Sequence, residues 1–576
     1  SAVRALSVVK GKSDRLWPVD YRNLDAEELG SIYESLLEFH PPSDPVQSYS
    51  LLEAAGNERK GTGSYYTPTS LVECLLDSTL DPVLDRAMAA DDPDAALLAV
   101  TVCDPACGSG HFLVAAARRI AKRLAAHRTG DPEPPPEQVR TALREVVGKC
   151  VYGVDVNPLA AELAKVSLWL EAMEPGRPLA FLDAQIKVGN ALIGATPRLL
   201  EEGIPDDAFK PIEGDDRKVV AALRKRNASE RKHPDQYEFF AADELETVHN
   251  AKLAVAMRNV VAERALSLAD VHVQRKRLSD YVASDDYRHA KLVADAWSAA
   301  YVWRKAEGAV PAITQAKFEQ LLKDSDALDA AQRAEVERLA AEYRFFHWHL
   351  EFPHLFPPAS QGGSFNEVTG WAGGLSVICG NPPWERVKLQ EQEFFAARDA
   401  EIAGARNANA RKNLIKKLAD SNPVLLDEFE AAKREAEGAS HFLRNSGRYP
   451  LNGRGDINTY AVFAEAGRHV TGADGRCGLI LPSGIATDAT TQFFFKDLVQ
   501  RSALASLYDF ENARPLFVGV HRSYKFCLLT VAGRNDHVAS ADFSFFAHHP
   551  SDLLRENARF TLTPEEIQLL NPNTGT

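Results

Sequence analysis

Two consecutive prolines follow a short apolar run near residue 380, and together they make a place suited to chemistry. The run Leu375–Cys379 predicts a buried strand, and Asn381-Pro382-Pro383-Trp384 comes one residue later. Each proline fixes its own φ and restricts the residue before it, so this segment is rigid and extended. Asn381 and the carbonyl of Pro382 could accept the two hydrogens of a planar exocyclic amine while Trp384 stacks on its ring. Taken alone, the four residues also fit an ordinary turn.

A second chemical feature is a glycine-rich turn between an apolar run and a helix-like stretch. The run Leu97–Val102 leads to Asp104, Gly108 and Gly110, and residues 113–124 have helical spacing. Strand, glycine turn and helix bring backbone amides close to a ligand. The spacing is not the dinucleotide fingerprint, and no Lys-Ser/Thr pair follows to cradle phosphate. Asp104 would repel pyrophosphate but suits the cationic methionine end of S-adenosylmethionine. A tight strand-to-helix turn without a ligand is the alternative.

The next apolar run, residues 150–154, ends in a carboxylate. Asp155 at the tip of this second strand could accept hydrogen bonds from both ribose hydroxyls of a nucleoside. The adenine ring would then lie against Val156, and Asn190 could reach the edge of the same ring. A helix-capping role for Asp155, before Asn157-Pro158, is an alternative that could hold at the same time.

In this order the segments resemble the adenine-N6 DNA methyltransferases. The likeness is to the gamma-class arrangement of fused type IIG restriction–modification enzymes and of large phage-defence methyltransferases of the BREX or DISARM kind. It runs from about Leu24 to the C-terminus, with two long inserts. It implies an α/β fold, a Rossmann-like S-adenosylmethionine-dependent methyltransferase sheet with large helical insertions. It also implies site-specific methyl transfer from that cofactor to N6 of a flipped adenine in double-stranded DNA, with other defence-system subunits as candidate partners.

The resemblance assigns roles to individual residues. The stretch from Gly63 to Pro68 matches the family's upstream cofactor segment, and Asn381 to Trp384 match its catalytic tetrapeptide. Phe517 matches the aromatic that packs on the second face of the flipped base, with Trp384 on the first. The cofactor-binding residues implied are Tyr66, Thr67, Pro68, Asp104, Ala106, Gly108, Gly110, Phe112, Asp155, Val156 and Asn190. Asn190 stands where many relatives carry an acidic residue.

Composition is ordinary for a globular chain of this length. The 576 residues are 45% hydrophobic and 25% charged, and no 18-residue uncharged apolar stretch or signal-peptide pattern is present. The sequence therefore predicts no membrane span. The seven cysteines are odd in number and lie mostly in apolar runs, which indicates buried, reduced thiols in a cytoplasmic protein. Ser1 in place of Met indicates a processed or excised piece.

A net charge of −14 argues against nucleic acid, but a local basic lining can outweigh the global charge. Three basic patches lie in helix-like inserts, and each could instead be a solvated face. They are Arg224, Lys225, Arg226, Arg231 and Lys232; Arg275, Lys276 and Arg277; and Arg406, Arg411, Lys412, Lys416 and Lys417. We expect the third to contact DNA, because it follows the catalytic tetrapeptide closely.

Periodicity and composition divide the chain into six parts. We expect an N-terminal helical region at 1–60, which includes a helix over residues 24–37, and the cofactor-binding half of the methyltransferase domain at 61–200. A helical insertion follows at 201–365, the catalytic strand and tetrapeptide at 366–384, and a second insertion at 385–460. The remainder of the sheet occupies 461–576, with strands at Cys477–Pro482, Leu504–Phe510 and Lys525–Val531. In relatives a target-recognition region follows about here, so the chain is expected to stop before it.

Four other interpretations compete with this one. Asp44 with Glu58-Arg59-Lys60 mimics a metal-nuclease pattern, although these residues lie in polar loops rather than on adjoining strands. The same tetrapeptide serves methylation of a glutamine amide or of an RNA amine, but the long inserts and the segment Tyr65–Pro68 favour DNA. A catalytically silent DNA-binding subunit of a defence complex is the third, and the intact candidate residues argue against it. A zinc site at His347, His349 and His354 is the fourth. Core packing is favoured there, and no metal is expected.

Overall fold

The computed structural model describes residues 67–232, 242–261, 266–357, 365–517 and 520–570, with the backbone alone for 242–249. Before residue 67 it describes the backbone of two short antiparallel pairs: β1 (Val8–Lys10) with β2 (Leu16–Pro18), and β3 (Phe39–His40) with β4 (Leu52–Glu53). These four strands lie in the N-terminal part that was expected to be helical, so that part is not helical throughout. The helix expected over residues 24–37 lies outside the described residues.

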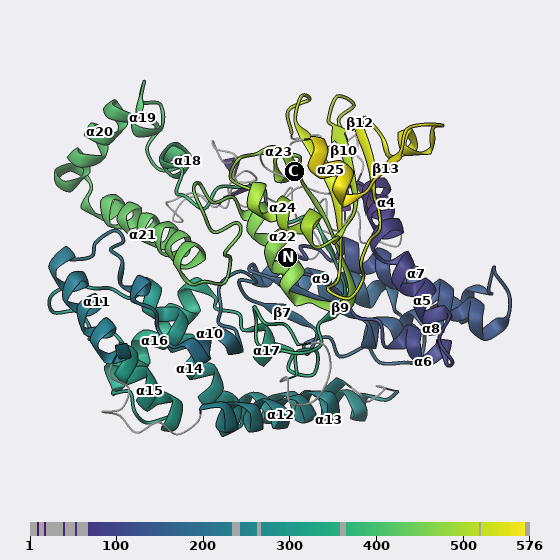
Figure 1. Ribbon diagram of the computed structural model, residues 1–576, viewed down its shortest axis with the longest axis horizontal. Helices are drawn as coiled ribbons and strands as arrows, with labels where there is room; N and C mark the ends of the chain where they lie inside the picture. Colours follow the sequence, from purple (N-terminus) through teal and green to yellow (C-terminus); the bar gives the residue numbers. More distant parts are fainter. Residues whose placement is uncertain are drawn as a thin grey trace.

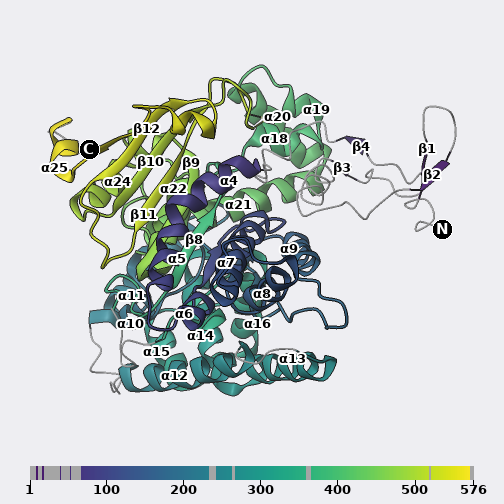
Figure 2. The ribbon, with the colours of Figure 1, turned by 90° about the vertical axis from the view of Figure 1, so that its right-hand side faces the viewer.

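A single nine-stranded sheet forms the centre of the molecule (Figures 1 and 2). Its order is β13-β12-β10-β11-β9-β8-β5-β6-β7. The strands are β5 (Val102–Asp104), β6 (Val151–Asp155), β7 (Ile186–Val188), β8 (Leu375–Gly380), β9 (Thr471–Pro482), β10 (Leu504–Glu511), β11 (Lys525–Ala532), β12 (Ala541–Ala547) and β13 (Phe560–Leu562). The strands from β7 to β9 are parallel, and β11 runs antiparallel between β9 and β10. The expected α/β methyltransferase sheet is confirmed.

The sheet changes its direction of growth between β5 and β8. From β5 the chain adds β6 and β7 on one side, and after the first insertion it returns to pair β8 with the other side of β5, in the register Cys103 to Ile378. A topological switch of this kind leaves a crevice outside the carboxyl ends of the two central strands. Asp104 ends β5, and Asn381 follows β8 directly. The sheet thus brings together residues that lie far apart in the sequence.

Alternating side chains bury both faces of the sheet. Val102, Val377 and Ile480 pack with the helices α4 (Thr69–Thr79), α7 (His111–Thr129), α8 (Pro136–Lys149) and α9 (Pro158–Glu171) on one face. Cys103, Ile378 and Leu479 pack on the other face with α22 (Thr459–Val470), α24 (Gln492–Gln500) and the first insertion. Figure 2 shows α4 and the following α5 (Asp81–Met88) crossing the sheet.

The first insertion is built from helices between β7 and β8. They are α10 (Pro197–Glu202), α11 (Arg217–Lys232), α12 (Ala242–Val261), α13 (Leu268–Ala283), α14 (Asp285–Val302), α15 (Gln315–Lys323), α16 (Ala330–Tyr343) and α17 (Trp348–Glu351). Helix α14 lies at the centre of this insertion. Its Trp297 and Tyr301 are fully buried and pack on Phe442 of the second insertion. The insertion shares one hydrophobic core with the sheet and is not a separate domain.

The second insertion is an arm that leaves the body directly after Trp384. It contains α18 (Glu391–Ala396), α19 (Ala400–Ala403), α20 (Ala408–Ser421) and α21 (Pro423–Asn445), and Figure 1 shows these helices standing away from the sheet. Its outer part has its own small core, which includes Phe395, Ile415 and Phe429. None of the described helices has the length and apolar character needed to cross a membrane.

Candidate active site

Asp104 is the buried acid of the site. Its side chain is 2% exposed, and its Oδ1 accepts a hydrogen bond of 3.0 Å from the amide of Ala106. Burial raises the pKa of Asp104 to about 7, the Ala106 N–H lowers it, and the charge of Asp155 raises it. A Cβ at Gly380 would lie 2.5 Å from Oδ1, so glycine there lets the carboxyl lie over the end of β8. The acid therefore lies beside Gly380, the residue that precedes the tetrapeptide Asn381 to Trp384.

The glycine turn is held against the second strand by Asp155. Gly108 and Gly110 have φ values of +51° and +84°, a region that favours glycine. The amide of Gly108 donates to Asp155 Oδ2 at 2.8 Å. Phe112 behind the turn is buried in the core under α7, so it supports the turn rather than lining an open site.

Asp155 bridges two backbone amides at the tip of β6. Besides Gly108, its carboxylate accepts a hydrogen bond of 2.7 Å from Asn157 N. Asn157 itself is the N-cap of α9 and accepts from Leu159 N at 3.0 Å, so the capping role considered for Asp155 belongs to Asn157. Burial raises the pKa of Asp155, while these hydrogen bonds and the charge of Arg344 lower it. Each carboxylate oxygen keeps lone-pair capacity for a hydroxyl.

The first insertion reaches the far end of this site through Arg344. Arg344 ends α16 in a left-handed conformation, with φ 52°, and its guanidinium donates to the carbonyl of Val156. Its own carbonyl accepts from the amide of Asn190 at 2.7 Å. The side chain of Val156 is 50% exposed, whereas Asn190 Oδ1 accepts from Leu192 N at 3.1 Å. Asn190 therefore uses its carbonyl oxygen to hold a turn, and its amide nitrogen forms no hydrogen bond among the described residues.

Asn381 meets the upstream segment and leaves one acceptor unused. Its Nδ2 donates to Thr67 Oγ1 at 3.1 Å, and its Oδ1 is buried with no donor among the described residues. Thr67 is 6% exposed and precedes Pro68, the N-cap residue of α4. Tyr66, the third expected residue of this segment, lies outside the described residues. A buried acceptor without a donor could take a hydrogen bond from a ligand.

Trp384 belongs to an aromatic cluster beside Asn381. Its Nε1 donates to Ile480 O at 3.2 Å, which fixes the indole on β9. Tyr524 lies parallel to it, with ring centroids 5.6 Å apart and 7° between planes. Phe517 is 2% exposed and meets Trp384 edge-on, at 5.4 Å and 75°.

The rings of Trp384 and Phe517 meet edge to face in this structure, and their expected places on the two faces of a flipped base stay a prediction. Tyr524, which sequence reasoning missed, supplies the parallel ring. Its place in a polar loop before β11 gave no signal of that role. Phe517 is held by two hydrogen bonds with the Asn512 side chain, at 2.9 and 3.0 Å, so its backbone position is well defined.

The structure separates the three basic patches. In the first two, charged side chains pair with neighbouring carboxylates, as in Arg226 with Glu230 at 2.7 Å and Lys276 with Asp280 at 2.6 Å. In the described part of the chain, none of the five basic residues on and before α20 forms an ion pair. Arg406, Lys412, Lys416 and Lys417 are exposed, and the half-buried Arg411 donates to Ile402 O at 3.4 Å. Among the described residues, the third patch is thus the one in which no basic side chain is paired with a carboxylate.

The competing metal interpretations gain no support. His347 Nε2 lies 3.0 Å from Asp295, its Nδ1 accepts from Ala195 N, and His354 contacts the Tyr152 hydroxyl. No cluster of three or more metal-binding side chains occurs within the residues that the structure describes. The nuclease-like Asp44 and residues 58–60 lie outside them.

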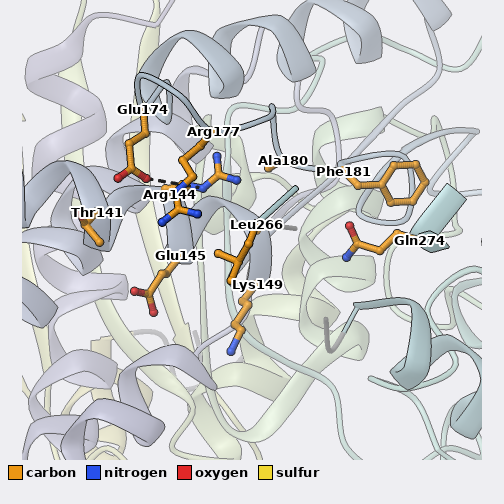
Figure 3. A pocket seen from close by; sticks show the side chains of 11 residues that line it. Thr141, Arg144, Glu145, Lys149, Glu174, Arg177, Ala180, Phe181, Leu266 and Gln274 are labelled. Atoms are coloured by element: carbon orange, nitrogen blue, oxygen red, sulfur yellow. Dashed lines mark ion pairs between the residues drawn. The ribbon is translucent and has the colours of Figure 1, made fainter. Parts of the chain in front are cut away.

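A separate cavity of about 130 Å³ lies away from this site (Figure 3). It lies beside α8, whose last turn leads into the amino end of β6, and Arg144, Glu174 and Gln274 are among its lining residues. Arg144 donates to Pro178 O at 2.6 Å. Because it adjoins the amino end of β6, this cavity lies at the opposite end of the parallel strands from Asp104 and Asn381, which lie at the carboxyl ends.

Two protein-family models match parts of this chain that include the site. The model of the Eco57I restriction-modification methylase family matches residues 149–416, and that of the N-6 DNA Methylase family matches residues 45–192. Between them, these matches span the glycine turn, Asp155 and the tetrapeptide. The resemblance to adenine-N6 DNA methyltransferases is therefore confirmed.

Individual relatives match shorter stretches. A predicted type II restriction enzyme and methyltransferase of Methanocaldococcus jannaschii is 26% identical over 30% of this chain and 17% of its own length. The adenine-specific methyltransferase PglX of Streptomyces coelicolor is 33% identical over 25% of this chain and 9% of its own. The matched stretches are thus less than a fifth of either relative. The type IIL restriction-modification enzyme MmeI in complex with DNA aligns with 95% of this chain and 44% of its own, at 11% identity and a TM-score of 0.37.

Proposed function

We propose that this chain transfers a methyl group from S-adenosylmethionine to N6 of an adenine flipped out of double-stranded DNA. The reaction is site-specific and serves a bacterial restriction–modification or phage-defence system. The observation that carries the proposal is the unused, buried Oδ1 of Asn381 at the switch point of the sheet, beside Asp104.

The residues present fit the cofactor. The pKa of Asp104 is raised to about 7. A sulfonium cation beside this carboxyl group would favour its ionised form. The left-handed Gly108 and Gly110 keep the turn free of side chains, and Asp155 can accept ribose hydroxyls. Val156 would offer an exposed apolar surface to the face of the adenine ring, and Asn190 Nδ2 would donate to the edge of that ring. The sulfonium supplies an activated methyl group.

The tetrapeptide would act on the target amine by alignment. The adenine has to leave the stack, because its N6 cannot be reached inside the duplex. Trp384 then stacks on the base, a contact worth roughly 1–3 kcal/mol. Asn381 Oδ1 and the Pro382 carbonyl accept the two amine hydrogens, which directs the nitrogen lone pair toward the methyl donor. S-adenosylmethionine would supply the methyl group, so the N–C bond would form as the C–S bond breaks and S-adenosylhomocysteine leaves, and the methylated amine would then release its proton to water. Alignment and matched polarity supply the acceleration without a strong base.

Helix α20 is the proposed contact to the phosphate backbone. Its unpaired cations face solvent on an arm that begins at the catalytic tetrapeptide, and phosphate neutralisation needs such cations. We further propose a cytoplasmic location, which suits the seven free cysteines, and other defence-system subunits as partners.

The test is transfer of tritiated methyl groups from S-adenosylmethionine to duplex DNA, RNA and protein in parallel. We expect label in DNA, at N6 of adenine. Label in RNA or in a glutamine amide would support the related amine methyltransferases instead. Binding of DNA without cofactor binding would support a catalytically silent subunit.

A further inference from the structure

The second insertion leaves and rejoins the body beside the catalytic tetrapeptide. The amide of Val387 donates to Ile457 O at 3.0 Å, Arg386 forms an antiparallel bridge with Asn458, and Thr459 N donates to Glu385 O at 2.8 Å. These contacts close the base of the arm with a short ladder that starts one residue after Trp384. The return point of the arm is therefore fixed against the tetrapeptide.

The hydroxyl of Thr459 extends this ladder into the tetrapeptide itself. It donates to Pro383 O at 2.6 Å, with a longer contact of 3.0 Å to Glu385 O. It also accepts from Glu385 N at 3.0 Å. A hydroxyl has one hydrogen, so the shorter contact to Pro383 is the main bond. Thr459 is the first residue of α22, which packs on β8 and β9, so the donor stands on a rigid element.

A proline pair needs such an external donor. Proline has no N–H, so neither Pro382 nor Pro383 can be held through a backbone donor of its own. The ring fixes φ of Pro383, and the Thr459 hydrogen bond to its carbonyl fixes ψ. Because the peptide unit is planar, the plane that carries the Pro382 carbonyl is then oriented relative to α22. Within the described residues Pro383 O receives a donor, and no bond to Pro382 O is formed.

We propose that Thr459 is a positioning residue for methyl transfer. Its hydroxyl holds Pro383 so that the Pro382 carbonyl points at the target amine, and it couples this alignment to the base of the second insertion. The inference rests on the proposed function and adds a residue that acts on the amine only through the tetrapeptide.

Thr459→Val and Thr459→Ser test this in the full chain. Valine keeps the shape and removes the hydroxyl, while serine keeps the hydroxyl. We expect kcat for methyl transfer to DNA to fall roughly 10- to 100-fold in Thr459→Val, since small misplacements of a reacting group have effects of that size. KM for DNA and the Kd for S-adenosylmethionine should stay within about twofold, and Thr459→Ser should recover most of kcat.

Thr471→Val is the matched control. Thr471 is buried at the other end of α22, and its hydroxyl donates to Gly467 O at 2.7 Å, away from the tetrapeptide. This variant should lower thermal stability with little effect on kcat. A 2-aminopurine placed at the target position should still report base flipping in Thr459→Val, because the variant disturbs alignment and not extrusion.

Three results would overturn the inference. An unchanged kcat in Thr459→Val would do so, and so would a failure of serine to recover the loss. So would a loss of cofactor and DNA affinity in proportion to kcat, which indicates general misfolding. If the unchanged protein transfers no methyl group to DNA, the proposed function itself fails, and an active Thr459→Val contradicts only this inference.

Discussion

At the scale of single residues, the site contains two buried polar groups whose burial is only partly compensated among the described residues. Asp104 is buried beside another acid, and Asn381 Oδ1 has no donor among the described residues. Burying such groups costs free energy unless a partner arrives. The natural partners are a cation for the first and an amine hydrogen for the second.

The pKa of Asp104 leads to a pH-dependent cofactor affinity. Because its pKa is raised to about 7 in the free protein, a cationic ligand must release a proton when it binds below that pH. We expect the affinity for S-adenosylmethionine to rise about tenfold per pH unit below the pKa and to level off above it. Titration calorimetry across this range, with buffers of different ionisation enthalpy, measures both affinity and proton release. In Asp104→Asn the affinity should be weaker and independent of pH, and a flat profile in the unchanged protein would contradict the assignment.

The same pKa has a consequence for stability with the opposite sign. A carboxyl with a raised pKa in the folded state stabilises the protein fully below its unfolded pKa of about 4, and this contribution is lost as pH rises through about 7. The cofactor-free protein should therefore lose stability over this interval relative to Asp104→Asn. Urea unfolding at several pH values measures the difference between the two proteins. If the two proteins change in parallel, Asp104 does not titrate in this range.

Gly380 tests the contact between the two central strands. A Cβ there would lie 2.5 Å from Asp104 Oδ1, so Gly380→Ala should destabilise the fold by about 1–3 kcal/mol and weaken cofactor binding. The cost should shrink in an Asp104→Ala background. Gly148→Ala is the control, because nothing lies within 4 Å of its added methyl. Equal effects of the two alanines would show that the carboxyl does not occupy this space.

At the scale of elements, the sequence predicted most of the parts that local pattern determines. Apolar runs and the turn-forming residues after them predicted β8 and β10, together with the glycine turn and the tetrapeptide. Arg344, Tyr524 and Thr459 were missed, because each reaches the site from an element whose position depends on tertiary packing. The strand β12 and the edge strand β13 were missed too, since their pairing partners are set by the sheet.

The DNA contact proposed for helix α20 can be tested by removing its charges. Lys412 and Lys416 lie one turn apart and are exposed, so Lys412→Gln with Lys416→Gln removes two candidate phosphate contacts. We expect weaker DNA binding of all sequences, and a slope of log Kd against log salt that is smaller by about two. Fluorescence anisotropy over a salt series measures both.

The double variant Arg226→Gln with Lys276→Gln is the matched control, because it also removes two positive charges. Both side chains are exposed but paired with carboxylates on their own helices, so the slope should not change. Equal slopes for the two double variants would remove α20 from the DNA interface.

At the scale of the whole molecule, two insertions are attached to one sheet at opposite sides of its switch point. The first contacts the carbonyl of Val156 through Arg344, and the second begins and ends at the tetrapeptide. The sequence showed that both insertions exist. Their contacts with the site could not be predicted, because they depend on how distant helices pack around the shared core.

The proposed function requires Asn381 to accept a hydrogen of an adenine amine beside a bound methyl donor. Its most direct test measures N6-methyladenine by mass spectrometry in duplex DNA, after incubation with S-adenosylmethionine and either the unchanged protein or Asn381→Ala. We expect N6-methyladenine with the unchanged protein and none with the variant, while both bind the cofactor equally. Comparable methylation by Asn381→Ala would contradict it.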